Sequence, residues 1–595
     1  MGSRREARRK GLPQLPKVRV NTPLFFLLAA VLLLFGGYYD FTALLAGAVL
    51  ALLLLHAILR RGTLPLPRGP ALWLLAGMVL CAFLTAPLAL SPGMALTGGL
   101  RWLAALLFFL YAATYTGAEK ELILDSVSWL GAGMAAVSLC VFLVNRLTGV
   151  ADANGRIDGF FQYANTYALF LMICLLLLLL KEERKKQDYG AMALLVVVIF
   201  LSGSRGVFLL LAAAGGVLFL HALAARRRVL PALLGAAAAA ALGGLAVLLS
   251  GGLVLDRLLA ITLESSSLNG RLLYNLDGLR ILAAHPLGVG RGGYLYVQPL
   301  FQTGPYILRS IHNEYLQAAL DGGILSGVLL LALAGWVVLR RGAPLRTRAA
   351  AAALALHACI DFDFQFFGML CLLLLLGSGG AVREVSVPRP ALWAAGGLAA
   401  AALGFFTLPY TLSFFGNSKG AYALWPADLS LAEERLQHCA SLEEAGEIAG
   451  RILSATDASM LAWDCAFTLA AQEADYRTMA QCRFQYLRLN PYRPEVYEEM
   501  TALLENACEQ DPAGLGRYKT LAEQTAGHLE EVYARTSPLA YRIADRPDFS
   551  FRPALLIRLE EIEEREYHEV EQKTALGTPD GGDGSDHPAA RRSGG

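Results

Sequence analysis

Long apolar runs separated by short polar clusters make up most of the chain up to residue 410. A membrane-spanning helix needs about 20 mostly apolar residues, and shorter apolar runs form helices that protein encloses. The pattern therefore predicts an all-α, polytopic transmembrane bundle of about 12 to 13 spans over residues 23–410. The predicted spans lie near residues 23–37, 41–59, 71–90, 98–116, 124–147, 163–180, 190–202, 207–224, 230–250, 314–339, 349–361, 366–380 and 391–410.

Clusters of Lys and Arg set the expected orientation, because such clusters stay in the cytoplasm. If the spans alternate, all of these clusters fall on one side; they lie at residues 1–22, 60–68, 120, 181–186, 226–228, 340–348 and 383–389. We expect a cytoplasmic basic N-terminus at residues 1–22 and a retained anchor after it, since no small-residue cleavage site follows. The loops expected outside are 148–162, 203–206, the long segment 251–313, and 361–365.

After residue 410 the composition becomes that of a soluble helical domain. Residues 418–567 are rich in Ala, Leu and Glu, and NPYRPEVY at 490–497 is typical of a junction between tetratricopeptide (TPR) repeats. We expect a TPR-like helical domain there, outside because the span count is odd, and a disordered tail at 574–595. An outside location permits disulfides without requiring them; the cysteines of this domain are Cys439, Cys465, Cys482 and Cys508.

Composition excludes an ordinary soluble enzyme. Of the 595 residues 55% are hydrophobic and 17% are charged, whereas about 25% are charged in an average soluble domain. The net charge of +2 sums 51 basic and 49 acidic residues that lie in different parts of the chain, so it identifies no partner. The nine cysteines include no CxxC pair and no Cys/His spacing of a zinc site. We expect no metal, no cofactor and no nucleic acid partner.

Arg205 stands in the short turn LSGSRG (201–206), between two apolar runs. So short a turn keeps the arginine near the bilayer surface, where a charge is costly and usually marks a functional site. The alternative is that its side chain only snorkels to the interface.

Three more arginines of the predicted outer loops stand in candidate motifs. Arg156 precedes Asn165, which alternatively caps the next helix. Arg271 precedes an amphipathic stretch, and Arg291 lies in the glycine-rich turn HPLGVGRGGY. Such a turn can offer backbone N–H groups to phosphate, but this one lacks the lysine and the strand-to-helix setting of a nucleotide-binding loop.

His312 and Asn313 stand where a long predicted span begins, in SIHNEYLQ (310–317). Position alone does not separate a catalytic histidine from a helix cap or a hydrogen-bond donor. Several arginines and one base that titrates near neutrality, on one side of a membrane, suit a diphosphate leaving group and a hydroxyl nucleophile. In the loop 361–365, Asp361 and Asp363 either orient these groups or form a turn that faces water.

The order of these motifs resembles the O-antigen ligase and O-antigen polymerase superfamily over about residues 20–380. The motifs are RxxGFFxxxN (156–165), SRG (204–206), GR followed by a helix (270–284), HPLGVGxG (285–292) and HNxxLQxxxDGGI (312–324). The C-terminal helical domain lies outside this resemblance.

The resemblance implies a metal-independent, inverting glycosyltransferase on the outer face of the cytoplasmic (inner) membrane. The donor would be a glycan on a polyprenyl diphosphate such as undecaprenyl diphosphate, and the acceptor a hydroxyl of a glycan, a lipid-linked sugar or a protein. The resemblance further implies that Arg205 and Arg271 hold the diphosphate and that His312 is the base. The expected substrate-binding residues are Arg156, Asn165, Arg291, Asn313 and Asp361.

Several alternatives stay open. Within the superfamily the sequence does not separate a ligase from a polysaccharide polymerase or a protein O-oligosaccharyltransferase. A transporter of lipid-linked sugars would also need arginines near the bilayer, although we find no internal repeat. A scaffold held by its spans would leave Arg205 and Arg271 without a role. Besides donor, acceptor and membrane lipids, partner proteins are expected to bind the C-terminal helices, since helical repeats present concave surfaces.

Overall fold

The computed structural model describes residues 22–150, 155–224, 229–262 and 264–565. The predicted basic N-terminus, apart from Thr22, the cluster 226–228 and the predicted tail 574–595 lie outside the described residues. The chain divides into two compact units, of residues 1–302, 306–438 and 542–544, and of residues 303–305, 439–541 and 545–595. We call them the bundle unit and the C-terminal unit.

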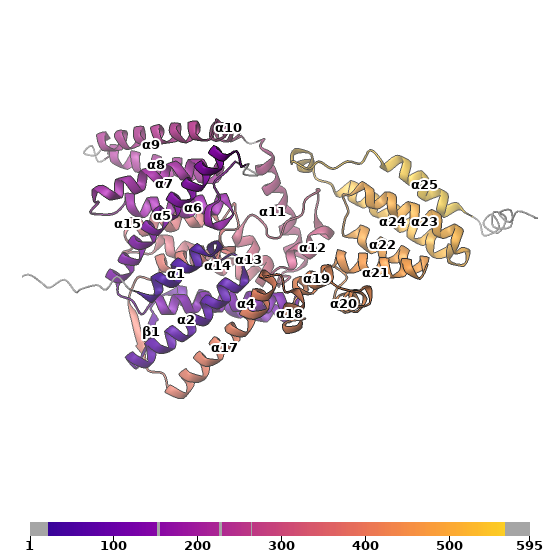
Figure 1. Cartoon of the computed structure of the whole chain (residues 1–595), viewed down its shortest axis with the longest axis horizontal. Helices are drawn as coiled ribbons and strands as arrows, with labels where there is room; N and C mark the ends of the chain where they lie inside the picture. The colour runs from indigo at the N-terminus through magenta and orange to yellow at the C-terminus, as the bar shows by residue number, and fades with distance from the viewer. Residues whose placement is uncertain (1–21, 151–154, 225–228, 263, 566–595) are drawn as a thin grey trace, which may run out of the picture. The chain divides into compact units, whose positions relative to one another are not determined.

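The bundle unit is built of helices, with one small antiparallel sheet in which Leu64 pairs with Val385 (Figure 1). Its elements are α1 (Pro23–Leu33), η1 (Phe35–Gly37), α2 (Asp40–Arg61), β1 (Leu64–Pro67), α3 (Pro70–Thr85), η2 (Ala86–Leu88), α4 (Pro92–Ala112), α5 (Gly117–Thr148), η3 (Gly159–Phe161), α6 (Ala164–Leu179), α7 (Lys186–Leu201), α8 (Arg205–Ala224), α9 (Val229–Leu249), α10 (Leu253–Leu259), α11 (Ser266–Ala284), α12 (Gly293–Phe301), α13 (Glu314–Gly322), α14 (Ile324–Leu339), α15 (Leu345–His357), η4 (Asp363–Gln365), α16 (Phe367–Gly377), β2 (Val382–Val385), α17 (Arg389–Phe414), α18 (Ser418–Leu424) and α19 (Leu429–Gln437).

All thirteen predicted apolar runs are helical, but fewer of them are long enough to cross a bilayer. Seven helices within the described ranges meet the length and composition of a span: α2, α3 with η2, α4, α5, α8, α9 and α17. The predicted count of 12 to 13 spans is therefore not confirmed. Runs of 10 to 14 residues are more typical of helices enclosed by protein. The 11-residue α16 fits this description, since every one of its residues is buried.

The long predicted span 314–339 is broken in the structure into α13 and α14. Gly323, between them, has a φ of +85°, a backbone conformation that favours glycine. A Cβ atom at this position would also lie 3.1 Å from the backbone of Leu287. The chain thus turns at Gly323 against the glycine-rich segment that follows α11.

Helices α8 and α9 lie at the rim of the bundle (Figure 1). Both helices expose large apolar side chains. Examples are Leu209 and Val217 on α8 and Leu230 and Leu248 on α9. On α17, Trp393 and Leu398 are exposed in the same way. A helix that is apolar all round needs an apolar environment, so these surfaces are suited to lipid, and the protein is a membrane protein.

The basic loops predicted to face the cytoplasm meet at one end of the bundle. Strands β1 and β2 pair there, and Lys120 Nζ donates to the Ser378 carbonyl over 2.8 Å. Lys181 and Arg346 both reach Asp125 over 2.7 Å. Five loops far apart in sequence therefore lie side by side.

Helices α18 and α19 belong to the bundle unit, although the sequence placed residues 418–567 in one C-terminal domain. Asp428, ahead of α19, accepts a hydrogen bond from Tyr410 of α17 over 2.5 Å. The Leu429 amide donates to Ser91 Oγ over 3.2 Å. These polar contacts with α17 and with the start of α4 hold the segment in the bundle, and the unit boundary falls after His438.

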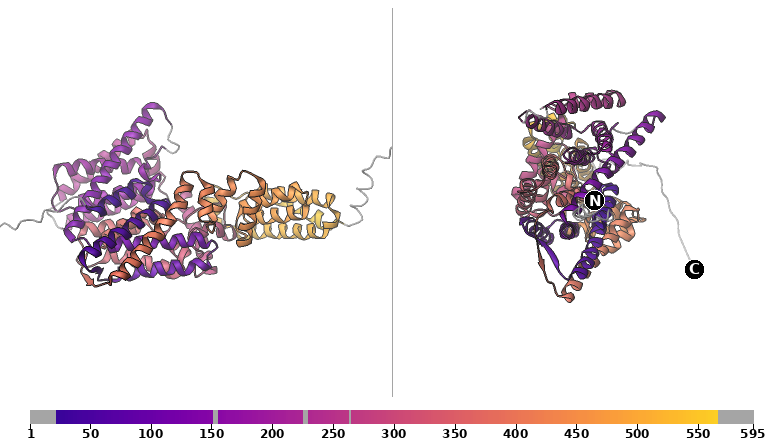
Figure 2. Two further views of the ribbon diagram at one scale, coloured as in Figure 1. Left: turned by 60° about the horizontal axis from the view of Figure 1, so that its bottom comes forward. Right: turned by 90° about the vertical axis from the view of Figure 1, so that its left-hand side faces the viewer.

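The C-terminal unit contains α20 (Leu442–Ala455), α21 (Met460–Gln472), α22 (Tyr476–Arg488), α23 (Pro494–Gln510), η5 (Pro512–Gly514), α24 (Leu515–Arg535), η6 (Pro538–Arg542) and α25 (Arg552–Glu564). Successive helices pack on one another, and α22 also packs on α24 (Figure 2). Buried apolar residues such as Tyr497, Leu504 and Leu529 form the core. The tetratricopeptide assignment stays a prediction, and no cysteine of the described residues forms a disulfide.

Candidate active site

The loops predicted to lie outside supply one polar cluster centred on the Asp361 carboxylate, of which 1% is exposed. Asp361 accepts hydrogen bonds from Tyr163 Oη and Asn165 Nδ2, each over 2.8 Å, and from Arg271 Nη2 over 3.2 Å. Burial raises the pKa of Asp361, but the charges of His357, Arg271 and His312 outweigh that effect and hold the pKa below its usual value. Asp361 is therefore an anion at neutral pH and orders the groups around it.

Arg156 is held by two neighbours of that carboxylate. Its Nη2 donates to Asn165 Oδ1 over 2.8 Å, and its Nε donates to the Ser202 carbonyl over 2.7 Å. Asn165 therefore links Arg156 to Asp361, and its side chain makes no cap to α6. Burial and the charges of Arg257 and Arg205 lower the pKa of Arg156, which shows that the arginines crowd together.

The tight turn before α8 explains how the arginines come so close. Gly203 has a φ of +62°, and a Cβ there would lie 3.5 Å from Arg257 Cγ and 3.6 Å from Arg156 Nε. Arg205, the first residue of α8, donates to the Ala260 carbonyl over 3.3 Å and lies in the field of Arg257 and Arg271. The turn thus leaves room for two guanidinium side chains and starts α8 with a third.

Arg257 is a member of the cluster that sequence analysis missed. It lies on the short helix α10, inside the segment 251–313 predicted as one long loop. Nothing near it in the sequence distinguishes it from a surface arginine. The signal that would have found it is the fold of α10, which returns the chain toward the 203–206 turn.

Positive charge is in excess here. The site holds four arginines and two buried carboxylates; the arginines are Arg156, Arg205, Arg257 and Arg271. Of the two carboxylates, Asp363 is already bound to His357 Nδ1 over 2.7 Å and to Thr166 Oγ1 over 2.8 Å. Guanidinium forks match phosphate oxygens. The cluster therefore suits a multiply charged phosphate ligand. Asp361 and Asp363 are both buried, so they do not form a turn that faces water, which was the alternative interpretation of the loop 361–365.

His312 stands beside this cluster, with its ring 5.1 Å from that of Phe362 and 6.1 Å from that of Tyr274. Burial and the charge of Arg271 lower the pKa of His312, although Asp361 acts in the opposite sense. The imidazole is thus neutral at pH 7 and able to accept a proton. Among the described residues neither His312 Nδ1 nor Arg271 Nε has a hydrogen-bond partner, although both atoms are buried. Buried polar atoms are normally hydrogen-bonded, so both are available to a ligand.

The helix cap is Asn313 and not His312. Asn313 Oδ1 accepts from the amides of Tyr315 and Leu316 over 3.1 and 3.2 Å, which starts α13. The side-chain oxygen of Asn313, predicted to bind substrate, is therefore used to fix the helix that follows His312.

Residues 190–332 match the family model described as O-antigen ligase (Wzy_C). These residues therefore form an O-antigen ligase domain. No curated protein and no solved structure matches it.

The O-antigen ligase match covers only part of the site. It includes Arg205, Arg257, Arg271 and His312, whereas the Asp361 network and Arg156 lie outside residues 190–332. The site is therefore completed by elements before and after the matched segment, η3, α6 and the loop after α15.

Arg291 lies inside the matched segment of the O-antigen ligase but makes its contacts elsewhere. Its Nη1 donates to Asp40 Oδ2 over 2.9 Å in a separate cavity. A Cβ at Gly290 would touch Ala89 and Ala95, and a Cβ at Gly98 would lie 2.7 Å from Arg291 Cβ. This close packing against η2 and α4 directs Arg291 toward α2, so the structure does not bring it together with His312.

Proposed function

We propose that this O-antigen ligase transfers a glycan from a polyprenyl diphosphate carrier to an acceptor hydroxyl, with inversion and without a metal, on the outer face of the cytoplasmic membrane. The observation that carries the proposal is the cluster of four arginines beside His312 and Asp361. A metal ion is replaced by guanidinium groups as the source of positive charge.

The arginines act on the leaving group. The bond between the anomeric carbon and the diphosphate oxygen breaks, and negative charge grows on that oxygen. Donors already fixed where charge develops are worth about 3 kcal/mol each in the transition state. Arg271 is fixed by Asp361 and by Ser267 Oγ over 2.8 Å, and Arg156 by Asn165 and Ser202. Arg205 and Arg257 complete the clamp.

His312 acts on the acceptor. As the acceptor hydroxyl attacks the anomeric carbon from the side opposite the diphosphate, its proton passes to the neutral imidazole, and polyprenyl diphosphate leaves. A single displacement of this kind inverts the anomeric configuration. A transferase requires a neutral base beside the residues that bind the diphosphate. A transporter of lipid-linked sugars has no need of such a base.

The expected topology supports an external site. The basic loops gather at one end of the bundle unit, whereas the residues around Asp361 come from loops predicted outside and from the adjoining ends of predicted spans. Since basic loops stay in the cytoplasm, the active site faces outward. Polymerase and protein O-oligosaccharyltransferase activities use the same site chemistry and differ in the acceptor.

The test uses the full chain in sealed proteoliposomes with a polyprenyl-diphosphate-linked oligosaccharide and a hydroxyl acceptor. A transferase releases one polyprenyl diphosphate for each glycosidic bond formed, and the product has the opposite anomeric configuration to the donor. Movement of the donor across the membrane without release would support the transporter, and retention of configuration would refute the single displacement.

A further inference from the structure

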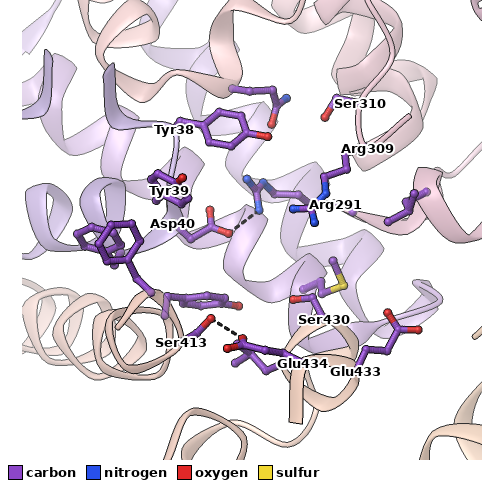
Figure 3. A pocket seen from close by; sticks show the side chains of 18 of the residues that line it. Tyr38, Tyr39, Asp40, Arg291, Arg309, Ser310, Ser413, Ser430, Glu433 and Glu434 are labelled. Carbon is purple, nitrogen blue, oxygen red and sulfur yellow. Dashed lines mark hydrogen bonds and ion pairs between the residues drawn. The ribbon is translucent and has the colours of Figure 1, made fainter. Parts of the chain in front are cut away.

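A second cavity of about 490 Å³ opens in the bundle unit around Arg291. Figure 3 shows Arg291 projecting into it between Asp40 and Arg309, with Glu433 and Glu434 across the cavity. The wall comes from eight regions of the chain: the start of α2, α4, α12, the loop before α13, α13, η4, the end of α17, and α19. The last two regions lie after the segment that matches the family.

Arg291 is held rigidly in this cavity. Asp40 binds Arg101 with one carboxylate oxygen and Arg291 with the other, each over 2.9 Å. Arg101 in turn donates to the Gln365 carbonyl over 2.8 Å. A guanidinium group with five N–H donors therefore faces the cavity in one fixed orientation.

The balance of charge differs from that at His312. Arg291 and Arg309 line the cavity with four carboxylates, which are Asp40, Asp321, Glu433 and Glu434, and Asp40 also pairs with Arg101. The carboxylates offset the positive charge, so a diphosphate is attracted more strongly to the arginine cluster, where arginines are in excess. Carboxylates and guanidinium groups placed at fixed points can instead hydrogen-bond to the hydroxyls of an uncharged ligand.

Aromatic side chains provide the remaining wall; they are Tyr38, Tyr39, Phe41, Tyr296, Tyr410 and Phe414. Phe414 packs on Phe41 and Tyr39 with ring centroids 4.9 and 5.0 Å apart, so these rings are fixed. Pyranose sugars offer apolar C–H faces that pack on such rings while their hydroxyls seek polar partners. Fixed aromatic rings combined with hydrogen-bonding charges suit a saccharide.

The cavity also reaches the loop that carries His312. Ser310 lines it, and two residues of extended chain span at most about 7 Å. The loop is fixed in place, because the Ile311 amide donates to Gln317 Oε1 over 2.8 Å and Gln317 also lines the cavity. Gln365, four residues after Asp361, lines it too. A saccharide in this cavity is therefore one loop away from the proposed base.

We propose that this cavity binds the acceptor as an uncharged, hydroxyl-rich saccharide. The inference rests on the proposed function, because it assigns a place to the acceptor of that reaction. It gives Arg291 a substrate-binding role, at the acceptor and not at the diphosphate, and it gives the residues after α17 a part in acceptor choice.

The experiment is binding of the purified full chain to an array of printed neutral and acidic oligosaccharides, with no donor present. Glu433→Gln and Arg309→Ala each remove one charged hydrogen-bonding group, and we expect each to weaken binding to a neutral glycan about tenfold or more. Arg271→Ala, in the diphosphate cluster, and Arg280→Ala, 54% exposed on the same helix, are expected to bind as the parent does. Thermal unfolding of every variant checks that it is folded.

Failure of the parent to bind any neutral glycan would overturn the inference. So would unchanged binding by both cavity variants, or a preference for acidic glycans. Loss of binding in Arg271→Ala would place the saccharide at the other cluster and also overturn it. Because the array needs no transfer, these results are independent of whether polyprenyl diphosphate is released, so the acceptor site and the transferase reaction can fail separately.

Discussion

The guanidinium group of Arg271 and the carboxylate of Asp361 lie 3.2 Å apart, although the two residues are 90 positions apart in the chain. The carboxylate is buried, and it also holds Tyr163 and Asn165. A single anion thus fixes Arg271 directly and Arg156 through Asn165, while its charge acts on His312. The relationship joins the diphosphate clamp to the base.

Replacing Asp361 with Asn tests this link. Asparagine keeps the shape but removes the charge, so Arg271 loses its ion pair, and we expect a donor KM higher by about tenfold, typical for a hydrogen bond to a charged group. Asp361 raises the pKa of His312, so its removal must lower that pKa further. Rates from pH 5 to 8 should show the acid limb moved to lower pH; a move to higher pH would contradict the coupling.

The transfer rate of the unsubstituted enzyme should fall at acid pH. His312 acts as a base only when neutral, and burial together with Arg271 puts its pKa below the usual 6.5. The rate is therefore expected to be level around pH 7 and to fall as the pH drops through that lowered value. A pH profile of kcat/KM measures this, and a midpoint above 6.5 would mean that another group is titrating.

Arg257→Ala tests the arginine that only the fold reveals. Loss of one guanidinium group from the clamp should lower kcat/KM by about 10-fold to 100-fold, since hydrogen bonds to charged groups contribute about 1.5–3 kcal/mol. Arg280→Ala is the matched control, because Arg280 is exposed and pairs with Asp277 instead. Equal rates for the two variants would remove Arg257 from the site.

Chelation tests whether the arginines are sufficient. If guanidinium groups supply all the positive charge at the diphosphate, transfer should proceed at the same rate after dialysis against EDTA. Loss of activity in EDTA and its recovery with a divalent cation would show that a metal takes part.

A reporter enzyme that is active only outside the cytoplasm, fused after residue 595, tests the topology. The predicted odd number of spans, together with the predicted cytoplasmic N-terminus, would place the C-terminal unit outside, so we expect the fusion to be active. If only a reporter that works in the cytoplasm were active at this position, the C-terminal end of the chain would lie in the cytoplasm, against the prediction.

Sequence patterns predicted the helices and most of the charged cluster because both leave local signals. Apolar runs define α2, α4 and α5, and Arg205 stood out because its turn is so short. Contacts between distant segments leave no such signal. Nothing local links Asp361 to Arg271, places α10 beside the 203–206 turn, or directs Arg291 to Asp40. The span count stays a prediction, because a helix such as α16 is as apolar as a span but is enclosed by protein.

The proposed function requires His312 and the arginines to act together in releasing polyprenyl diphosphate. The most direct test is the initial rate of polyprenyl diphosphate release by the full chain in nanodiscs, with donor and acceptor saturating. We expect His312→Ala and Arg205→Ala to lower this rate by about 100-fold or more, and Arg280→Ala to match the parent. Full release by His312→Ala would contradict the proposed function.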